Sequence, residues 1–352
     1  MRRASLRAAL PPRYLGGPWG GRRLLVFAGL LFLLALAFIV GVGQGAVSIA
    51  PLEVFRALVG LQQNPIVTEL RLPRVLGAVL VGAALGLAGA AYQGLFRNPL
   101  ADPYLMGVAA GAAFGFTLSI SFAGMVGAFG GALFFASVPG FAAFGAFVGA
   151  LLAVAFTLLL AGGAARSHDL ILAGVVVGSI LTGLSTLVLL LDSDRIREVF
   201  SYTLGSLAFM GWRGVEVMAL ALGGASPLLL GLSRALNALA LGEETARTLG
   251  LPLPQLRLLL IALSTLLTAI AVVYAGIIGF VGFVAPHILR KLVGGDYRFL
   301  LPASALGGGV LLALADLLAR VVARPTELPV GVVTTLLGGP FFLYLLWRAR
   351  RA

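Results

Sequence analysis

A short segment near residue 245 carries charged side chains in a pattern typical of a helix at a protein surface. Glu243 and Glu244 suit a helix N-terminus, and Arg247 follows them at the i+4 and i+3 spacings of an ion pair. Gly250 suits the C-terminal cap. The apolar residues of the segment have no evident core of their own, so we expect the helix either to dock into a groove of a partner protein or to rest on lipid. The candidate docking segment, within a loop at about 234–257, comprises Leu241, Gly242, Glu243, Glu244, Ala246, Arg247, Leu249 and Gly250.

A second polar segment, Arg97 to Pro103, separates two apolar runs. Pro99 and Pro103 prevent a continuous helix, and the side chains of Asn98 and Asp102 can satisfy the backbone groups that the prolines leave free. The segment is therefore either a rigid turn or a fixed constriction or hinge.

A third pattern lies inside an apolar run, where Gly174, Gly178, Thr182 and Ser185 recur at helical spacing on one face. A small, mildly polar stripe of this kind either contacts another helix or lines a pathway, and the sequence alone does not choose between them.

Asp316 is the carboxylate expected within an apolar span, and Arg320 follows it by one helical turn. An acidic residue near the centre of a bilayer can carry a coupled ion, but the spacing favours an ion pair at the edge of the span.

The sequence lacks the residues of a nucleotide-binding loop, a thiol site or a histidine-rich metal site. The only lysine, Lys291, is not in a phosphate-binding Gly-Lys-Ser/Thr motif, and the chain has no cysteine and two histidines. We therefore expect no catalytic residue, no metal site and no cofactor bound by this chain.

The composition places these segments in a membrane protein. Hydrophobic residues make up 60% of the 352 residues and charged residues 11%, and the mean hydropathy is +1.06. A soluble domain carries about 25% charged residues, because charges must cover its surface. The sequence predicts an all-α integral membrane protein with about ten transmembrane helices.

A membrane-spanning helix needs roughly 20 apolar residues. The predicted spans are Leu24–Val42, Val75–Leu95, Leu105–Phe122, Phe141–Ala161, Leu170–Leu191, Val215–Leu232, Leu258–Tyr274, Phe280–Leu292, Leu301–Val321 and Val330–Trp347. They form one permease-like domain over 23–352, after a basic tail over 1–22. The apolar, glycine-rich stretch Ala123–Pro139 is expected to be re-entrant or interfacial. Small residues four positions apart, such as Gly82 and Gly86, predict close helix packing.

The charges predict an orientation. With ten spans and both termini inside, more than twice as many Lys and Arg residues fall inside as outside, as the positive-inside rule requires. The acidic residues outside balance the cations there, so the net charge of +12 belongs to the inner face. The basic character is therefore an orientation signal, and no nucleic-acid partner is expected.

Several ordered motifs give the chain a resemblance to a known family along nearly its whole length. They are Arg71-Leu-Pro-Arg74, Asn98-Pro-Leu-Ala-Asp-Pro103 with Gly107, Leu241-Gly-Glu-Glu244 with Ala246, Arg247, Leu249 and Gly250, Gly279-Phe-Val-Gly-Phe283 with Pro286-His-Ile-Leu-Arg290, and Glu327-Leu-Pro-Val-Gly331 with Gly338-Gly-Pro340. In these motifs the chain resembles the FecCD-type permeases of binding-protein-dependent ABC importers for iron-siderophores, haem and cobalamin.

The resemblance implies a cobalamin-importer-like fold of ten spans in a bacterial cytoplasmic (inner) membrane, with both termini cytoplasmic. It implies a homodimer, or a close heterodimer, in membrane lipid. It also implies two cytoplasmic ATPase subunits that carry ATP-Mg, and a periplasmic or lipid-anchored substrate-binding protein. The docking segment then matches the coupling helix that enters the ATPase. The resemblance further implies three outward arginines that meet the binding protein and a two-part inner gate: Arg71, Arg74 and Arg320 for docking, and Asn98, Leu100, Ser167 and His168 for the gate.

The predicted function is that of a permease subunit, not itself an enzyme, which translocates an iron chelate (siderophore or haem) by alternating access. Cobalamin in the same importer class is an alternative substrate. A secondary transporter that couples ions through Asp316 is the competing class, and a membrane scaffold without substrate flux is a third.

Overall fold

The computed structural model describes residues 18–45, 49–126, 140–164 and 167–349, and these residues form helices and connecting loops without a strand. Helices occupy all ten predicted spans within this part of the chain. They are α1 (Pro18–Gly43), α3 (Leu72–Leu95), α4 (Val108–Val126), α6 (Phe141–Leu160), α7 (Ser167–Leu191), α9 (Trp212–Gly231), α12 (Leu253–Ala275), α13 (Val281–Val293), α14 (Tyr297–Val321) and α15 (Val330–Ala349).

Shorter helices connect these spans. They are α2 (Pro51–Leu58), α8 (Ile196–Thr203), α10 (Ser233–Ala240) and α11 (Glu243–Thr248), with a π-helical turn at Ile66–Arg71 and 3-10 turns at Pro103–Met106 and Ser193–Arg195. The predicted tail over 1–22 overlaps α1, which begins at Pro18. Residues 1–17 of that tail, and 127–139 of the predicted re-entrant stretch, lie outside the described residues.

Length and composition make this a multi-pass membrane protein. Seven helical spans of the described residues are long and apolar enough to cross a membrane, and Val108–Ala123 and Val330–Leu345 are shorter apolar helices. The remaining predicted span corresponds to α13, which has 13 residues and contains Pro286.

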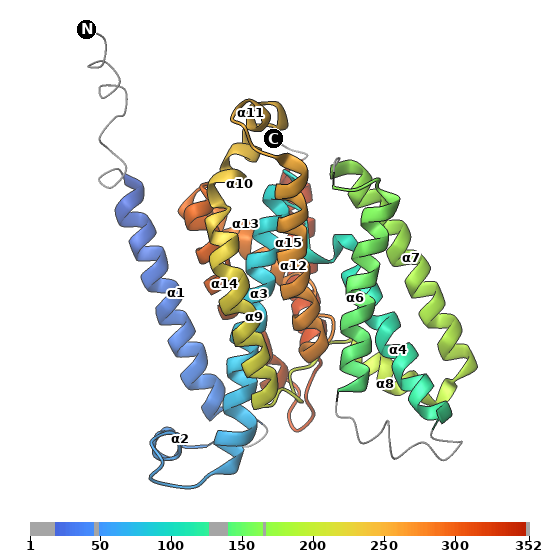
Figure 1. Cartoon of the computed structure of the whole chain (residues 1–352). Coiled ribbons are helices and arrows are strands. Elements are labelled where there is room, and N and C mark those ends of the chain that lie inside the picture. Colours follow the sequence, from blue (N-terminus) through green and yellow to red (C-terminus); the bar gives the residue numbers. More distant parts are fainter. Residues whose placement is uncertain (1–17, 46–48, 127–139, 165–166, 350–352) are drawn as a thin grey trace.

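The helices alternate in direction between two ends of the molecule (Figure 1). Arg22 of α1 donates to the carbonyl of Lys291, so the start of α1 lies beside the end of α13. Arg320, near the end of α14, donates to the carbonyl of Gly41 near the end of α1. We name the two ends by the short helices that they carry: the α11 end, where α1 begins and α15 ends, and the α2 end.

Helix α3 is the centre of the larger group of helices and packs most extensively against α14, and also against α12, α13 and α9. Glycines allow this close approach, because a Cβ atom at Gly82 or Gly86 would collide with the backbone of Gly308 or Ser304. The expected tight packing of small residues is therefore present.

Helices α4, α6 and α7 form a second group on one side of the molecule, where α12 packs against α4 and α6 (Figure 1). Much of α7 is exposed on this chain: Leu172 is 67% exposed and Leu190 75% exposed. An apolar surface of this kind contacts lipid or another helix in a membrane.

Candidate coupling site and gate segments

The predicted surface helix is present as α11, and its ends follow from the local sequence. Gly242, with φ +123°, precedes the helix, and Gly250, with φ +80°, follows it, conformations that glycine adopts without steric cost. Ala246 is fully buried, so the expectation that it lacks a core is wrong: it packs into the main hydrophobic core. The side chains of Leu241 and Leu249 are 73% and 63% exposed. Ala246 thus anchors α11 to the core, while Leu241 and Leu249 beside it are exposed at the surface.

The ion pair predicted inside α11 is not formed among the described residues. Oε1 of Glu243 lies 2.6 Å from Nη2 of Arg257, in the first turns of α12, and 3.7 Å from Nη2 of Arg97. Arg247 is exposed and makes no ion pair with either acid in this part of the chain. The physical reason is burial: the Arg257 side chain is 1% exposed and needs a counter-charge, whereas Arg247 is solvated.

Arg97 and Arg257 are therefore functional candidates that the sequence did not reveal. The only signal for Arg257 was a cation at the start of an apolar span, where a charge normally faces water. Nothing in the sequence indicated that it is buried against Glu243.

The α3–α4 loop has the predicted local chemistry. Oδ1 of Asn98 accepts a hydrogen bond from the amide of Leu100 at 2.9 Å, and Oδ1 of Asp102 accepts one from the amide of Tyr104 at 2.9 Å. Leu100 and Asp102 line a cavity of about 330 Å³ together with Gly279, Phe280, Phe283 and Phe342. The loop thus borders a space between α13 and α15.

The second predicted gate segment lies at the start of α7. His168 is exposed, and the side chain of Ser167 lies outside the described residues. No hydrogen bond or ion pair joins His168 to Asn98 or Leu100 in the described part of the chain. Among the described residues, the structure therefore does not join His168 to the first predicted gate segment by a polar contact.

The predicted stripe on α7 is divided. Gly174, Gly178 and Thr182 line an open groove of about 650 Å³ that also contains Asp102 and Tyr104. Ser185 is buried, donates to the carbonyl of Leu181, and does not line this groove. The groove joins α7 to the α3–α4 loop, because Asp102 borders both cavities.

The three arginines predicted to face outward are buried within this chain. Arg71 donates to the carbonyls of Val42 and Gly43. Arg74 contacts Asp316 at 3.0 Å and Glu327 at 2.8 Å. They lie at the α2 end, but their side chains stabilise contacts between helices, so their docking role stays a prediction.

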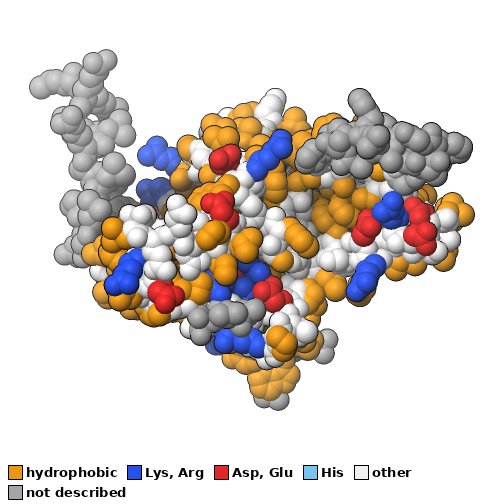
Figure 2. Space-filling view, turned by 90° about the horizontal axis from the view of Figure 1, so that it is seen from below, with side chains coloured by type: hydrophobic (Ala, Val, Ile, Leu, Met, Phe, Trp, Pro, Cys, Tyr) orange, Lys and Arg blue, Asp and Glu red, His pale blue; other side chains and the backbone are white. Residues whose placement is uncertain are grey.

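The predicted ion pair between Asp316 and Arg320 is present, at 2.9 Å. Arg320 also donates to the carbonyls of Gly41 and Gln44, and Arg74 is a member of this cluster that the sequence did not indicate. At the α2 end, acidic and basic side chains are interspersed among hydrophobic ones (Figure 2).

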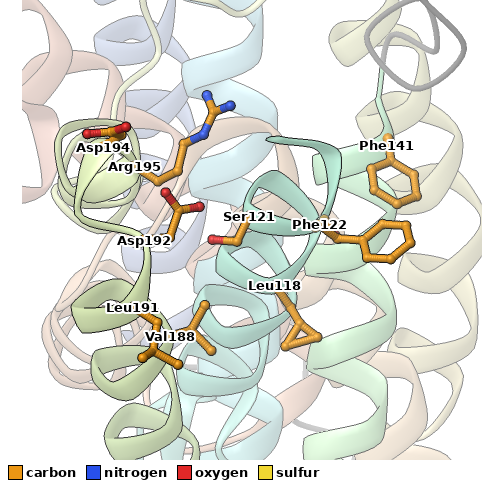
Figure 3. A pocket seen from close by; sticks show the side chains of 10 residues that line it. Leu118, Ser121, Phe122, Phe141, Val188, Leu191, Asp192, Asp194 and Arg195 are labelled. Atoms are coloured by element: carbon orange, nitrogen blue, oxygen red, sulfur yellow. The ribbon is translucent and has the colours of Figure 1, made fainter. Parts of the chain in front are cut away.

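A further cavity, near the α2 ends of α4 and α7, has a volume of about 680 Å³. Ser121 points from α4 toward Asp192, while Phe122 and Phe141 lie on the opposite side (Figure 3). None of the predicted gate or pathway residues lines it. In the described residues no group of three or more His, Cys, Asp or Glu side chains is placed to hold a metal ion.

Comparison with known proteins agrees with this architecture. The sequence pattern of the FecCD transport family matches residues 33–348. The chain is 39% identical to the hemin transport system permease protein HmuU of Yersinia pestis, over 93% of this chain and 96% of that protein. It is 39% identical to the ferric enterobactin transport system permease protein FepD of Escherichia coli, over 94% and 97%. It is 38% identical to the vitamin B12 import system permease protein BtuC of Citrobacter koseri, over 92% and 94%.

A solved structure described as an inward-facing, metal-chelate type ABC transporter has the same fold. Its TM-score is 0.77 at 33% identity, and the match covers 92% of this chain and 99% of that one. Ten helices in the order predicted, a family match over most of the chain and relatives of similar length agree with one another. The chain therefore belongs to the FecCD transport family, and it is a membrane-spanning permease of an ABC importer.

Proposed function

We propose that this chain is the translocation subunit of an ATP-driven importer of an iron chelate in a bacterial cytoplasmic membrane. In this proposal two copies form a homodimer around the pathway, and both termini are cytoplasmic. Two ATPase subunits bind ATP-Mg at the α11 end, and a periplasmic or lipid-anchored binding protein delivers substrate at the α2 end. ATP binding moves α11 and switches the pathway between outward and inward openings.

The observation that carries the proposal is the shape of α11. Ala246 holds the helix against the core, while Leu241 and Leu249 project from the end of the molecule. Two exposed leucines beside a short charged helix suit the groove of a partner protein, as in other helix-in-groove contacts. Two glycines of the docking segment, Gly242 and Gly250, have positive φ and flank α11 on its two sides.

The pathway proposal rests on the α7 groove and on the α3–α4 loop. Gly174, Gly178 and Thr182 form an uncharged wall of this groove, and the α3–α4 loop contributes one acidic residue, Asp102. A wide, mostly uncharged lining suits transit of a bulky chelate rather than tight binding. Ser185 lies on the same helix but is buried, so we leave it out of the lining. Asn98 and Leu100 form one inner gate segment in this proposal, and Ser167 and His168 form the second.

The names of the relatives support the proposed substrate class. Two of them are named for hemin and ferric enterobactin, and one for vitamin B12. An iron chelate, siderophore or haem, is the proposed substrate, and cobalamin is the alternative in the same importer class. Uptake of radiolabelled ferric siderophore, hemin and cobalamin into vesicles that hold the complete transporter shows which of the three compounds is carried. The proposed class of transporter requires ATP inside the vesicles for this uptake.

Docking at α11 is tested by replacing Leu241 and Leu249 with serine in one variant. We expect the ATPase subunit to stop copurifying with the permease and ATP-dependent uptake to be lost. Leu220 of α9 offers a matched control, because its side chain is 77% exposed but lies on a spanning helix. Normal ATPase binding by the Leu241→Ser/Leu249→Ser variant would contradict the assignment of α11.

A further inference from the structure

One carboxylate at the base of α11 contacts two separate parts of the membrane domain. Oε1 of Glu243 lies 2.6 Å from Nη2 of Arg257 on α12 and 3.7 Å from Nη2 of Arg97 in the α3–α4 loop. Arg97 is adjacent to Asn98, whose side chain holds the amide of Leu100. Movement of Glu243 would therefore act on Arg97, next to the first predicted gate segment.

Arg257 makes a further contact that extends this cluster. Its Nη1 donates to the carbonyl of Ala164 at 3.4 Å, in the connection that precedes α7 and the second predicted gate segment. The side chain of Arg257 is 1% exposed, while those of Glu243 and Arg97 are 30% and 46% exposed. Arg257 is thus the buried member of a cluster whose other members reach the surface.

The chemistry of the guanidinium explains why arginine suits this position. Its planar fork holds several donors in fixed directions, so one side chain can contact Glu243 and Ala164 at once. A buried guanidinium also cannot simply release its carboxylate, because an unpaired buried charge is strongly unfavourable. When α11 moves, Arg257 is expected to follow Glu243 and to shift the backbone carbonyl of Ala164 with it.

We infer that Arg257 is a positioning residue that couples displacement of α11 to the gate segment at the start of α7. This inference rests on the proposed role of α11 as the ATPase-docking helix. Arg257 does not touch substrate or nucleotide in this scheme, and it acts through Glu243 and the Ala164 carbonyl. Loss of Arg257 should leave ATPase docking at α11 intact, but movement of α11 should no longer change the gate segment at the start of α7.

Single-cysteine labelling can test this coupling, since the chain has no cysteine of its own. Thr248→Cys reports on α11 and His168→Cys reports on the start of α7, and both positions are exposed. The complete transporter, with its ATPase and binding protein, is reconstituted in vesicles. The rate of maleimide modification of the permease is then measured with and without a non-hydrolysable ATP analogue.

Without further substitution, we expect the analogue to change the modification rate at both positions by about tenfold, a common size for coupling between two sites. Adding Arg257→Gln should preserve the response at position 248 and abolish it at position 168. Arg257→Lys keeps the charge near Glu243 but loses the planar fork, so it should give an intermediate response at position 168. An undiminished response at both positions in Arg257→Gln would overturn the inference.

Arg298→Gln is the matched control, because Arg298 also pairs with a carboxylate, Asp296 at 2.6 Å, and this pair lies at the start of α14. It should keep both responses, and loss of the response in this control would also overturn the assignment to Arg257. If position 248 does not respond even with Arg257 present, the proposed role of α11 fails and the inference fails with it. If Arg257→Gln does not assemble, Arg257→Lys alone decides: a response at position 168 equal to that with Arg257 overturns the inference.

Discussion

Nε of Arg74 lies 3.0 Å from Oδ1 of Asp316, although the two residues are 242 positions apart in the sequence. The side chains are 10% and 1% exposed, and Nε of Arg320 lies 2.9 Å from the other carboxylate oxygen. One carboxylate therefore joins two guanidinium groups and ties α3 to α14. This arrangement suits a structural ion pair better than a site that must bind and release a coupled ion.

Asp316→Asn should destabilise the protein strongly, because it leaves the buried guanidinium of Arg320 without a carboxylate and that of Arg74 with only the part-exposed Glu327. We expect a loss of about 3–5 kcal/mol in the free energy of unfolding, measured by thermal or denaturant unfolding in detergent. Glu327→Gln is the matched control: Glu327 also pairs with Arg74, but its side chain is 35% exposed. Its loss should cost at most about 1 kcal/mol.

The same variant distinguishes the two classes of transporter. A secondary transporter that uses Asp316 would lose uptake in Asp316→Asn, also in the protein that remains folded. In an ATP-driven permease, the Asp316→Asn protein that remains folded should still take up substrate in response to ATP. Complete loss of uptake by the folded fraction would therefore favour ion coupling.

Close glycine packing gives a second prediction. A Cβ atom at Gly86 would collide with the carbonyl of Ser304, whereas one at Gly223 of α9 would meet nothing within 4 Å. Gly86→Ala should lower the free energy of unfolding by about 1–3 kcal/mol through overpacking. Gly223→Ala should be neutral or stabilising by roughly 0.5–1 kcal/mol, because alanine favours a helix. Equal effects would contradict close packing of α3 on α14.

The sequence predicted the helices well because apolar runs and local end signals are properties of neighbouring residues. The span count and α11, with its flanking glycines, follow from such signals. The partner of Glu243 could not be predicted, since Arg257 becomes available only when α11 folds back onto α12. Likewise, the spacing of Asp316 and Arg320 indicated an ion pair, but nothing local indicated that Arg74 would join them.

Two glycines of the α7 stripe should respond in opposite ways to substitution. A Cβ atom at Gly174 would collide with the carbonyl of Leu105, so Gly174→Ala should impair folding. At Gly178 the nearest atom is 3.9 Å away, in Ala110, so a larger side chain fits and extends into the groove. Gly178→Phe should therefore leave the unfolding temperature nearly unchanged and reduce substrate uptake, while ATPase subunits still bind. Normal uptake by Gly178→Phe would remove the groove from the pathway.

The start of α14 should make stability depend on pH. Burial alone would raise the pKa of Asp296, but hydrogen bonds from Arg298 and Asn237 outweigh it and lower this pKa from its ordinary 3.8 to about 2. The contribution of Asp296 to stability is therefore fully present above pH 4 and is lost as the pH falls from about 4 to 2. Because the group is partly solvated, we expect a loss of only about 1 kcal/mol.

Asp296→Asn should remove this part of the pH dependence of unfolding. Arg298→Gln should only reduce it, because the hydrogen bond from Asn237 to Asp296, at 2.7 Å, remains. An unchanged acid profile in Asp296→Asn would mean that the carboxylate does not hold α10 against α14.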